Sequence, residues 1–247
     1  MLFFIEKQLE ACRNAILNLG FKESTPDNIR AILHEQPGEM TDVVVLVPGC
    51  QNDIMLQRRV RKLVEFTSDL HRANIRFSVV LSGRCPTGAT ARIPNEATRM
   101  NNLFRLQLAE ERPDLLSILP IFPLYGEDES NDTKKNVENF FSHLNFTHSK
   151  NPVYIVAISS TFHLIRLWNA LNFYIGDHLK HRKLAKGADK PGREIRQVSL
   201  IGAEDALFAK KPLLVGHFEY VKLMTYDLYE HYLNEQPHSA VGSFGFE

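Results

Sequence analysis

A serine, a histidine and an arginine lie close together just after a short apolar segment, at Ser160, His163 and Arg166. His163 and Arg166 are at positions i and i+3, so on a helix their side chains share a face. The hydroxyl, the guanidinium and the N-terminus of that helix would bind an anion, most naturally a phosphate or a carboxylate. The imidazole could then serve as a general acid or base. The alternative is that Ser160 only caps the helix and Arg166 pairs with a surface carboxylate.

An acidic segment from Glu127 to Asp132 follows another apolar run. It could bind a divalent metal or the hydroxyls of a ribose. It could also be a solvated loop whose charge stabilises the N-terminus of the next helix. We favour the solvated loop for Asp128 and Glu129, and both interpretations stay open for Glu127.

Small and polar residues follow the two other long apolar runs. Gly49 and Asn52 come after the first run, and Ser82, Gly83 and Arg84 come after the second. The backbone N–H groups of the second set, with its guanidinium, could hold an anion.

Several further polar residues lie where helices are expected to begin. Thr133 can be explained as a first-turn hydroxyl, Ser130 as part of a helix cap and Asn136 as an amide that holds a loop. Glu96 lies near a helix start, where its charge would complement the helix dipole.

Alternating strands and helices must position these residues. Short apolar runs bounded by Gly, Pro or polar residues predict buried strands, and the segments between them have helical spacing. The predicted strands are residues 43–48, 75–81, 118–122, 153–158 and 198–201. This pattern predicts an α/β fold with a doubly wound, mostly parallel Rossmann-like sheet of about five strands in the order 3-2-1-4-5. Its ligand crevice would lie between the first and fourth strands, where loops 48–53 and 159–166 face each other.

The predicted core spans residues 41–205. Residues 1–40 are expected to form a helical lead-in packed on the core, and residues 206–247 a C-terminal helix and tail. The basic stretch from His178 to Arg196 is expected to be an exposed connection.

Composition narrows the possible partners. The 29 basic residues balance 29 acidic ones, so no global field favours nucleic acid or an anionic membrane. The apolar start of the chain is too short for a signal peptide or a membrane span. The three cysteines, Cys12, Cys50 and Cys85, have no zinc-site spacing, and we expect reduced thiols in a cytoplasmic protein without a metal site of that kind.

The motifs, taken in order, resemble the domain-of-unknown-function family that includes the YdcF, SanA and ElyC proteins. The similarity covers about residues 41–176. It is carried by Gly49, Arg59, Ser82-Gly83, Glu96-Ala97, Glu127, Ser130, Thr133, Asn136, Ser160, His163 and Arg166. It implies a Rossmann-like fold with a small helical addition, but no defined reaction.

The chain departs from the family pattern at four positions. Arg84 replaces a glycine, Asp132 an asparagine, Lys135 a glutamate and Leu167 an alanine. Exchange of a carboxylate for an amine could change or abolish an activity, so the chain is expected to be a divergent member.

Three functions are compatible with this sequence. The first is a site for a phosphate-bearing or nucleotide-like small molecule, with hydrolysis or group transfer at the bound anion. There Arg59, Ser82, Ser160 and Arg166 would hold the anion, while His163 and Glu127 would transfer protons. The other residues expected to bind the ligand are Gly49, Asn52, Gly83, Glu96, Ser130, Thr133 and Asn136. The second is a non-catalytic sensor of S-adenosylmethionine or a nucleotide, and the third is an interaction protein with a decayed site. A divalent metal is a further possible cofactor.

Overall fold

The computed structural model describes eight segments of the 247-residue chain. They are residues 26–34, 41–50, 53–83, 95–124, 133–146, 151–160, 163–184 and 194–203. The expected N-terminal lead-in, apart from one helix, and the expected C-terminal helix and tail lie outside these segments.

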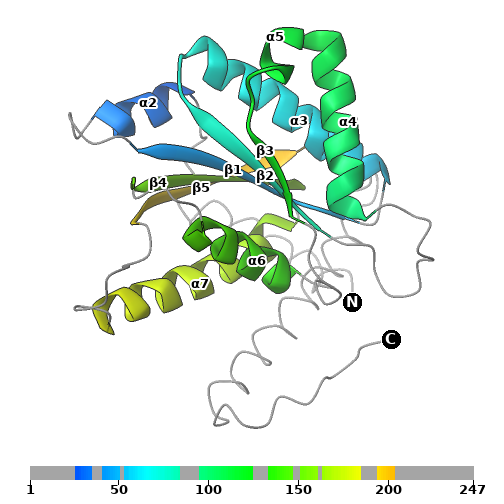
Figure 1. Ribbon diagram of the computed structural model, residues 1–247. Helices are drawn as coiled ribbons and strands as arrows, with labels where there is room; N and C mark the ends of the chain where they lie inside the picture. Colours follow the sequence, from blue (N-terminus) through cyan, green and yellow to red (C-terminus); the bar gives the residue numbers. More distant parts are fainter. Residues whose placement is uncertain are drawn as a thin grey trace, which may run out of the picture.

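Five parallel strands form one sheet in the order β3-β2-β1-β4-β5 (Figure 1). Their bounds are β1 Asp42–Pro48, β2 Phe77–Ser82, β3 Ile121–Leu124, β4 Val153–Ser160 and β5 Ile195–Ala203. The predicted α/β class and parallel sheet are confirmed. The chain first proceeds from β1 outward to β3, then crosses back to β4, so the strand order reverses between β1 and β4.

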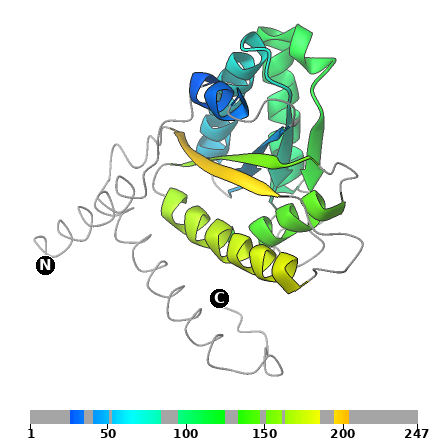
Figure 2. The same ribbon diagram turned by 90° about the vertical axis from the view of Figure 1, so that its left-hand side faces the viewer.

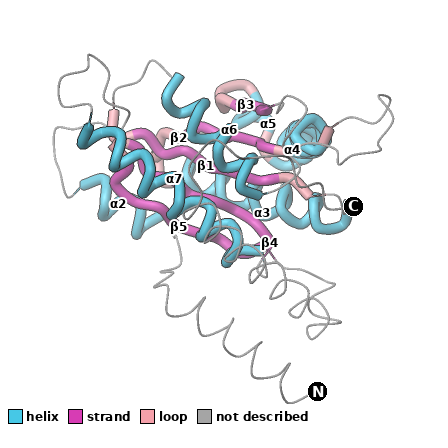
Figure 3. Tube along the Cα trace, turned by 90° about the horizontal axis from the view of Figure 1, so that it is seen from below, coloured by secondary structure: helices cyan, strands magenta, loops and turns pink. Residues whose placement is uncertain are grey.

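Helices cover both faces of the sheet. Their bounds are α2 Pro26–His34, α3 Asp53–Arg72, α4 Glu96–Glu111, α5 Pro113–Leu116, α6 Thr133–Phe146 and α7 Leu164–Leu184. α3, α4 and α5 lie on one face, and α6 and α7 on the other (Figures 1 and 2). Viewed from below, α6 lies toward β1 and β2, and α7 toward β4 and β5 (Figure 3).

The apolar sequence of β1 follows from this layering. Side chains of a strand point alternately to its two faces. Val43, Val45 and Val47 pack toward α3 and α4, while Val44 and Leu46 pack toward α6 and α7. All five are at most 3% exposed. A strand covered on both sides needs no polar position, which is why this run is apolar throughout.

Several expected boundaries are wrong. The second strand is Phe77–Ser82 rather than residues 75–81, and the fifth is Ile195–Ala203 rather than residues 198–201. The third strand begins at Ile121 rather than at residue 118, because Ile118 lies in the turn after α5 and is 61% exposed. The basic stretch after His178 is not all connection, since α7 continues to Leu184 and β5 begins at Ile195. Lysine, arginine and leucine are good helix formers, so a helix can continue there without an apolar stripe.

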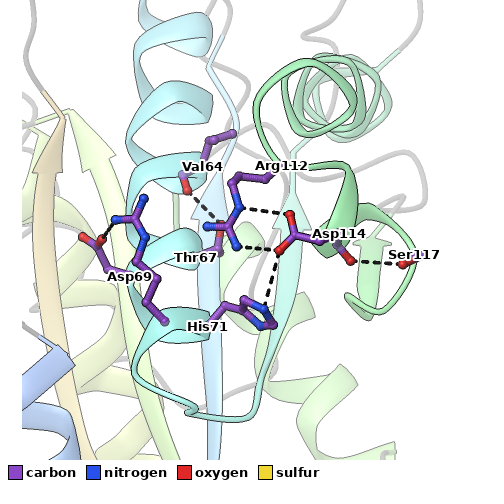
Figure 4. Close-up of polar contacts among 8 residues, drawn as sticks. Val64, Thr67, Asp69, His71, Arg112, Asp114 and Ser117 are labelled. Atoms are coloured by element: carbon purple, nitrogen blue, oxygen red, sulfur yellow. Dashed lines mark hydrogen bonds and ion pairs between the residues drawn. The ribbon is translucent and has the colours of Figure 1, made fainter.

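An ion-paired cluster fixes the end of α3 that is remote from the carboxyl edge of the sheet (Figure 4). Arg112, between α4 and α5, donates two hydrogen bonds to Asp114, at 3.0 and 2.6 Å. These bonds lower the pKa of Asp114 to about 2. His71 at the end of α3 lies 3.6 Å from the same carboxylate. The cluster therefore joins the ends of three helices at the amino edge.

Among the helices of the described segments, none combines the length and the apolar character needed to cross a bilayer.

The α3 face of the core should dominate stability. Leu63→Ala is expected to lower the free energy of unfolding by about 2–5 kcal/mol, because Leu63 is fully buried. Ile54→Ala on the same helix is the matched control, since Ile54 is 60% exposed and should change stability by less than about 0.5 kcal/mol. Urea denaturation measures both. Equal losses would contradict the packing described here.

Candidate functional site

Most buried polar side chains of the described segments lie at the carboxyl edge of the sheet. They are Arg59, Ser82, Glu96, Thr133, Asn136, Ser159, Ser160 and His163, each at most 7% exposed. Burial of polar groups costs free energy unless they are hydrogen-bonded. Here they bond largely to one another, around the point where the strand order reverses.

Arg59 joins the ends of β1 and β4. Its side chain comes from the second turn of α3 and is 1% exposed. Its Nε donates to Ser160 Oγ at 3.1 Å, and its Nη1 donates to the carbonyls of Pro48 at 2.6 Å and Gly49 at 2.9 Å. The guanidinium therefore bridges the two strand ends that were expected to face each other. These bonds engage Arg59 and Ser160 with the protein itself.

Glu96 begins α4 and lies against two glycines that end neighbouring strands. A Cβ atom on Gly83 would lie 2.8 Å from Glu96 Oε2 and 2.9 Å from the Cα atom of Gly49. A Cβ atom on Gly49 would overlap the Glu96 side chain as well. Glycine is required at both positions, because only a backbone without a Cβ atom lets the carboxyl group approach so closely.

Burial raises the pKa of Glu96 to about 7, and the positive charge of Arg59 opposes the rise. The carboxyl group is therefore near its titration midpoint at neutral pH, where it can both give and take a proton. Proton transfer was expected of His163 and Glu127, whereas Glu96 was expected to bind ligand or to complement the helix dipole. The sequence signal for Glu96 was its place in the Glu-Ala motif, but its burial depends on two glycines that are remote in sequence.

His163 links α6 to the end of β4. Its Nε2 lies 2.8 Å from Thr133 Oγ1, and its Nδ1 lies 2.7 Å from Ser159 Oγ. The ring is 5% exposed and directly precedes α7. It lies among hydroxyl groups at the same edge as Ser82, rather than in the apolar core. Ser159 was missed in the sequence, although its position four residues before His163 was a usable signal.

Ser82 and Asn136 hold the start of α6 against β2. Ser82 Oγ lies 3.1 Å from the Asn136 carbonyl oxygen and 3.2 Å from its side-chain oxygen Oδ1. One hydroxyl hydrogen is shared between these two acceptors. Asn136 was expected to hold a loop. In the structure it lies in the first turn of α6 and holds that turn against β2.

The other expected site residues are placed as follows. Arg166 is partly buried in the first turn of α7. Asn52, Glu127 and Ser130 lie outside the described segments. Lys135, which replaces a glutamate of the family pattern, forms an ion pair of 3.0 Å with Glu138 on its own helix.

No group of three or more His, Cys, Asp or Glu side chains within the described segments could hold a metal ion. Among the described residues, Glu96 is the buried carboxylate at this edge, and it lies near the cation Arg59 instead.

The chain matches none of the family models, curated proteins or solved structures with which it was compared. The resemblance to the YdcF, SanA and ElyC family therefore rests on the motif residues alone and stays a prediction.

The raised pKa of Glu96 predicts a pH-dependent stability. Between the ordinary value of 4.5 and about 7, the folded state keeps a proton that the unfolded state releases. Stability is therefore lost as pH rises through this window, by on the order of 3 kcal/mol in total. Glu96→Gln does not titrate, so its stability relative to the wild type should increase over the same window and then level off.

Urea denaturation from pH 4.5 to 8 measures this difference. Glu111→Gln is the matched control, because Glu111 is exposed at the other end of α4. A stability difference between Glu96→Gln and the wild type that does not change with pH would show that the carboxyl group is solvated.

Proposed function

We propose that the carboxyl edge of the sheet binds a phosphate-bearing or nucleotide-like small molecule, and that hydrolysis or group transfer takes place there. Ligands of open parallel sheets bind outside the strand ends where the strand order reverses. The observation that carries the proposal is the burial of Arg59 and Glu96 around the same residue, Gly49, at that point. A buried carboxyl group with a strongly raised pKa weakens a fold, and such groups cluster at functional sites.

The site residues divide into three sets. Arg59, Ser82 and Ser160 bond to the protein and form a rigid wall of the site. Arg166 is the side chain that we expect to hold the anion, since a guanidinium can donate two parallel bonds to a phosphate. Glu96 and His163 would transfer protons.

A thermal-shift screen of the intact chain tests the proposal. The panel contains nucleotides, phosphorylated sugars, S-adenosylmethionine and divalent metals. We expect a phosphate-bearing compound to stabilise the fold by about 2.7 kcal/mol at a hundred times its Kd, and to be turned over. Stabilisation without turnover would favour a sensor. No stabilisation by any compound of the panel would favour an interaction protein with a decayed site and would refute the proposal.

Substitutions at Arg166 should mainly affect binding, and substitutions at His163 should mainly affect turnover. With the ligand found in the screen, Arg166→Ala is expected to weaken binding by roughly 2–4 kcal/mol, because paired charge-assisted bonds are lost. Arg166→Lys should restore only part, since an ammonium cannot reproduce the guanidinium geometry. His163→Ala should chiefly lower kcat, by on the order of a hundredfold or more. Equal small effects at both positions would refute this division of roles, and calorimetry with steady-state kinetics measures both.

A further inference from the structure

Three side chains at the site form a continuous hydrogen-bonded row. Thr133 Oγ1 lies 2.8 Å from His163 Nε2, and His163 Nδ1 lies 2.7 Å from Ser159 Oγ. The three residues come from the start of α6, the turn before α7 and the end of β4. A hydroxyl, an imidazole and an orienting group in this order form the arrangement that activates a hydroxyl nucleophile.

We propose that Thr133 is a catalytic nucleophile, that His163 is its general base, and that Ser159 is a positioning residue for the imidazole. This inference rests on the proposed function and adds to it a covalent intermediate on the protein. Thr133 and His163 were expected to act separately, one in ligand binding and the other in proton transfer.

The tautomer decides which hydroxyl is activated. When Nδ1 carries the hydrogen, it donates to Ser159 Oγ, and Nε2 accepts the hydroxyl hydrogen of Thr133. The opposite tautomer would activate Ser159 instead. Ser159 is fully buried within β4 and is paired in register with Gly202 of β5. Thr133 is 7% exposed and begins a helix at the carboxyl edge, so a substrate has better access to Thr133.

The first turn of α6 is held in place by a second contact. Asn136 lies one turn after Thr133 and is bonded through both of its oxygens to Ser82 of β2. The nucleophile is therefore positioned from two sides, by the imidazole and by the neighbouring strand. Such positioning matters because a small displacement of a reacting group can lower the reaction rate strongly. The first N–H groups of α6 also have no acceptor within the helix and could stabilise charge on a substrate oxygen.

The reaction balances with water as the only co-reactant. Thr133 Oγ1 attacks the phosphorus of a phosphate ester and forms a P–O bond, while its hydrogen passes to His163 Nε2. The bond from phosphorus to the leaving oxygen breaks, and that oxygen takes the proton from His163. Water then attacks the phosphothreonine and gives a proton to His163. The released Thr133 oxygen takes this proton, so phosphate leaves and the hydroxyl is restored.

Diisopropyl fluorophosphate tests the nucleophile directly, because an activated hydroxyl displaces fluoride and keeps a stable phosphoryl group. We expect intact mass spectrometry to show one adduct on the wild type, which peptide fragmentation places on Thr133. Thr133→Val should abolish the adduct, Thr133→Ser should retain it within about tenfold, and His163→Gln should slow labelling by about a hundredfold or more.

The control is a second buried threonine. Thr67 in α3 is fully buried, and its hydroxyl bonds to the carbonyls of Leu63 at 2.8 Å and Val64 at 3.2 Å. Thr67→Val should therefore leave labelling unchanged. Circular dichroism establishes that each variant is folded before it is compared.

The role of Ser159 has its own signature. The ¹⁵N shifts of the His163 ring should show hydrogen on Nδ1 in the wild type and a mixture of tautomers in Ser159→Ala. A merely structural serine would leave these shifts unchanged.

The outcomes separate this inference from the proposed function. Three results would refute the assignment of Thr133 as the nucleophile. They are no adduct on the folded wild type, an adduct on another residue, and equal labelling of Thr133→Val. If phosphate-bearing compounds still stabilise the protein in that case, the binding proposal survives. Labelling of Thr133 without stabilisation by any such compound would support the nucleophile and refute the proposed ligand class.

Discussion

This edge of the sheet depends on the hydrogen bonds that the buried guanidinium of Arg59 donates. The guanidinium holds together the ends of β1 and β4 through the carbonyls of Pro48 and Gly49 and the hydroxyl of Ser160. Two parallel strands that end side by side leave carbonyl groups without a sheet partner, and burial makes such groups costly. A buried cation can satisfy several carbonyls at once, but it is itself costly unless every donor is matched. The hydrogen bonds of Arg59 thus both form the wall of the site and stabilise the ends of β1 and β4.

The same guanidinium affects the neighbouring carboxyl group. Glu96 is desolvated, which favours its neutral form, and the nearby positive charge favours the ionised form. The two effects leave the pKa near 7, where a small change in local charge would shift the proton. A phosphate-bearing ligand, as proposed above, would bring negative charge to the site and so favour protonation of Glu96. Arg59 can therefore influence the protonation of Glu96 without contact with a ligand.

Sequence patterns predicted the α/β class and the parallel sheet, because the signal of a buried strand is local, but they placed the ends of several strands wrongly. The β-branched run of β1 and its terminal Pro48-Gly49 could be recognised without knowledge of any neighbour. Helix length was harder to predict, since the basic end of α7 lacks an apolar stripe. The position of residues after strand ends predicted that they share one edge. Their long-range partners could not be predicted, because the contacts between Glu96 and Gly83, or between His163 and Thr133, depend on distances in the folded chain.

The sheet continues one hydrogen bond beyond the end of β1. The N–H group of Gly49 donates to the carbonyl of Ser82 at 2.5 Å, and the N–H group of Ala97 donates to Gly83 at 3.2 Å. Amides bonded in this way exchange with solvent only when the surrounding structure opens. The backbone at Gly49 and Ala97 therefore unfolds together with the core, rather than opening locally as a loop would. The amide hydrogens of Gly49 and Ala97 should exchange together with those of β1.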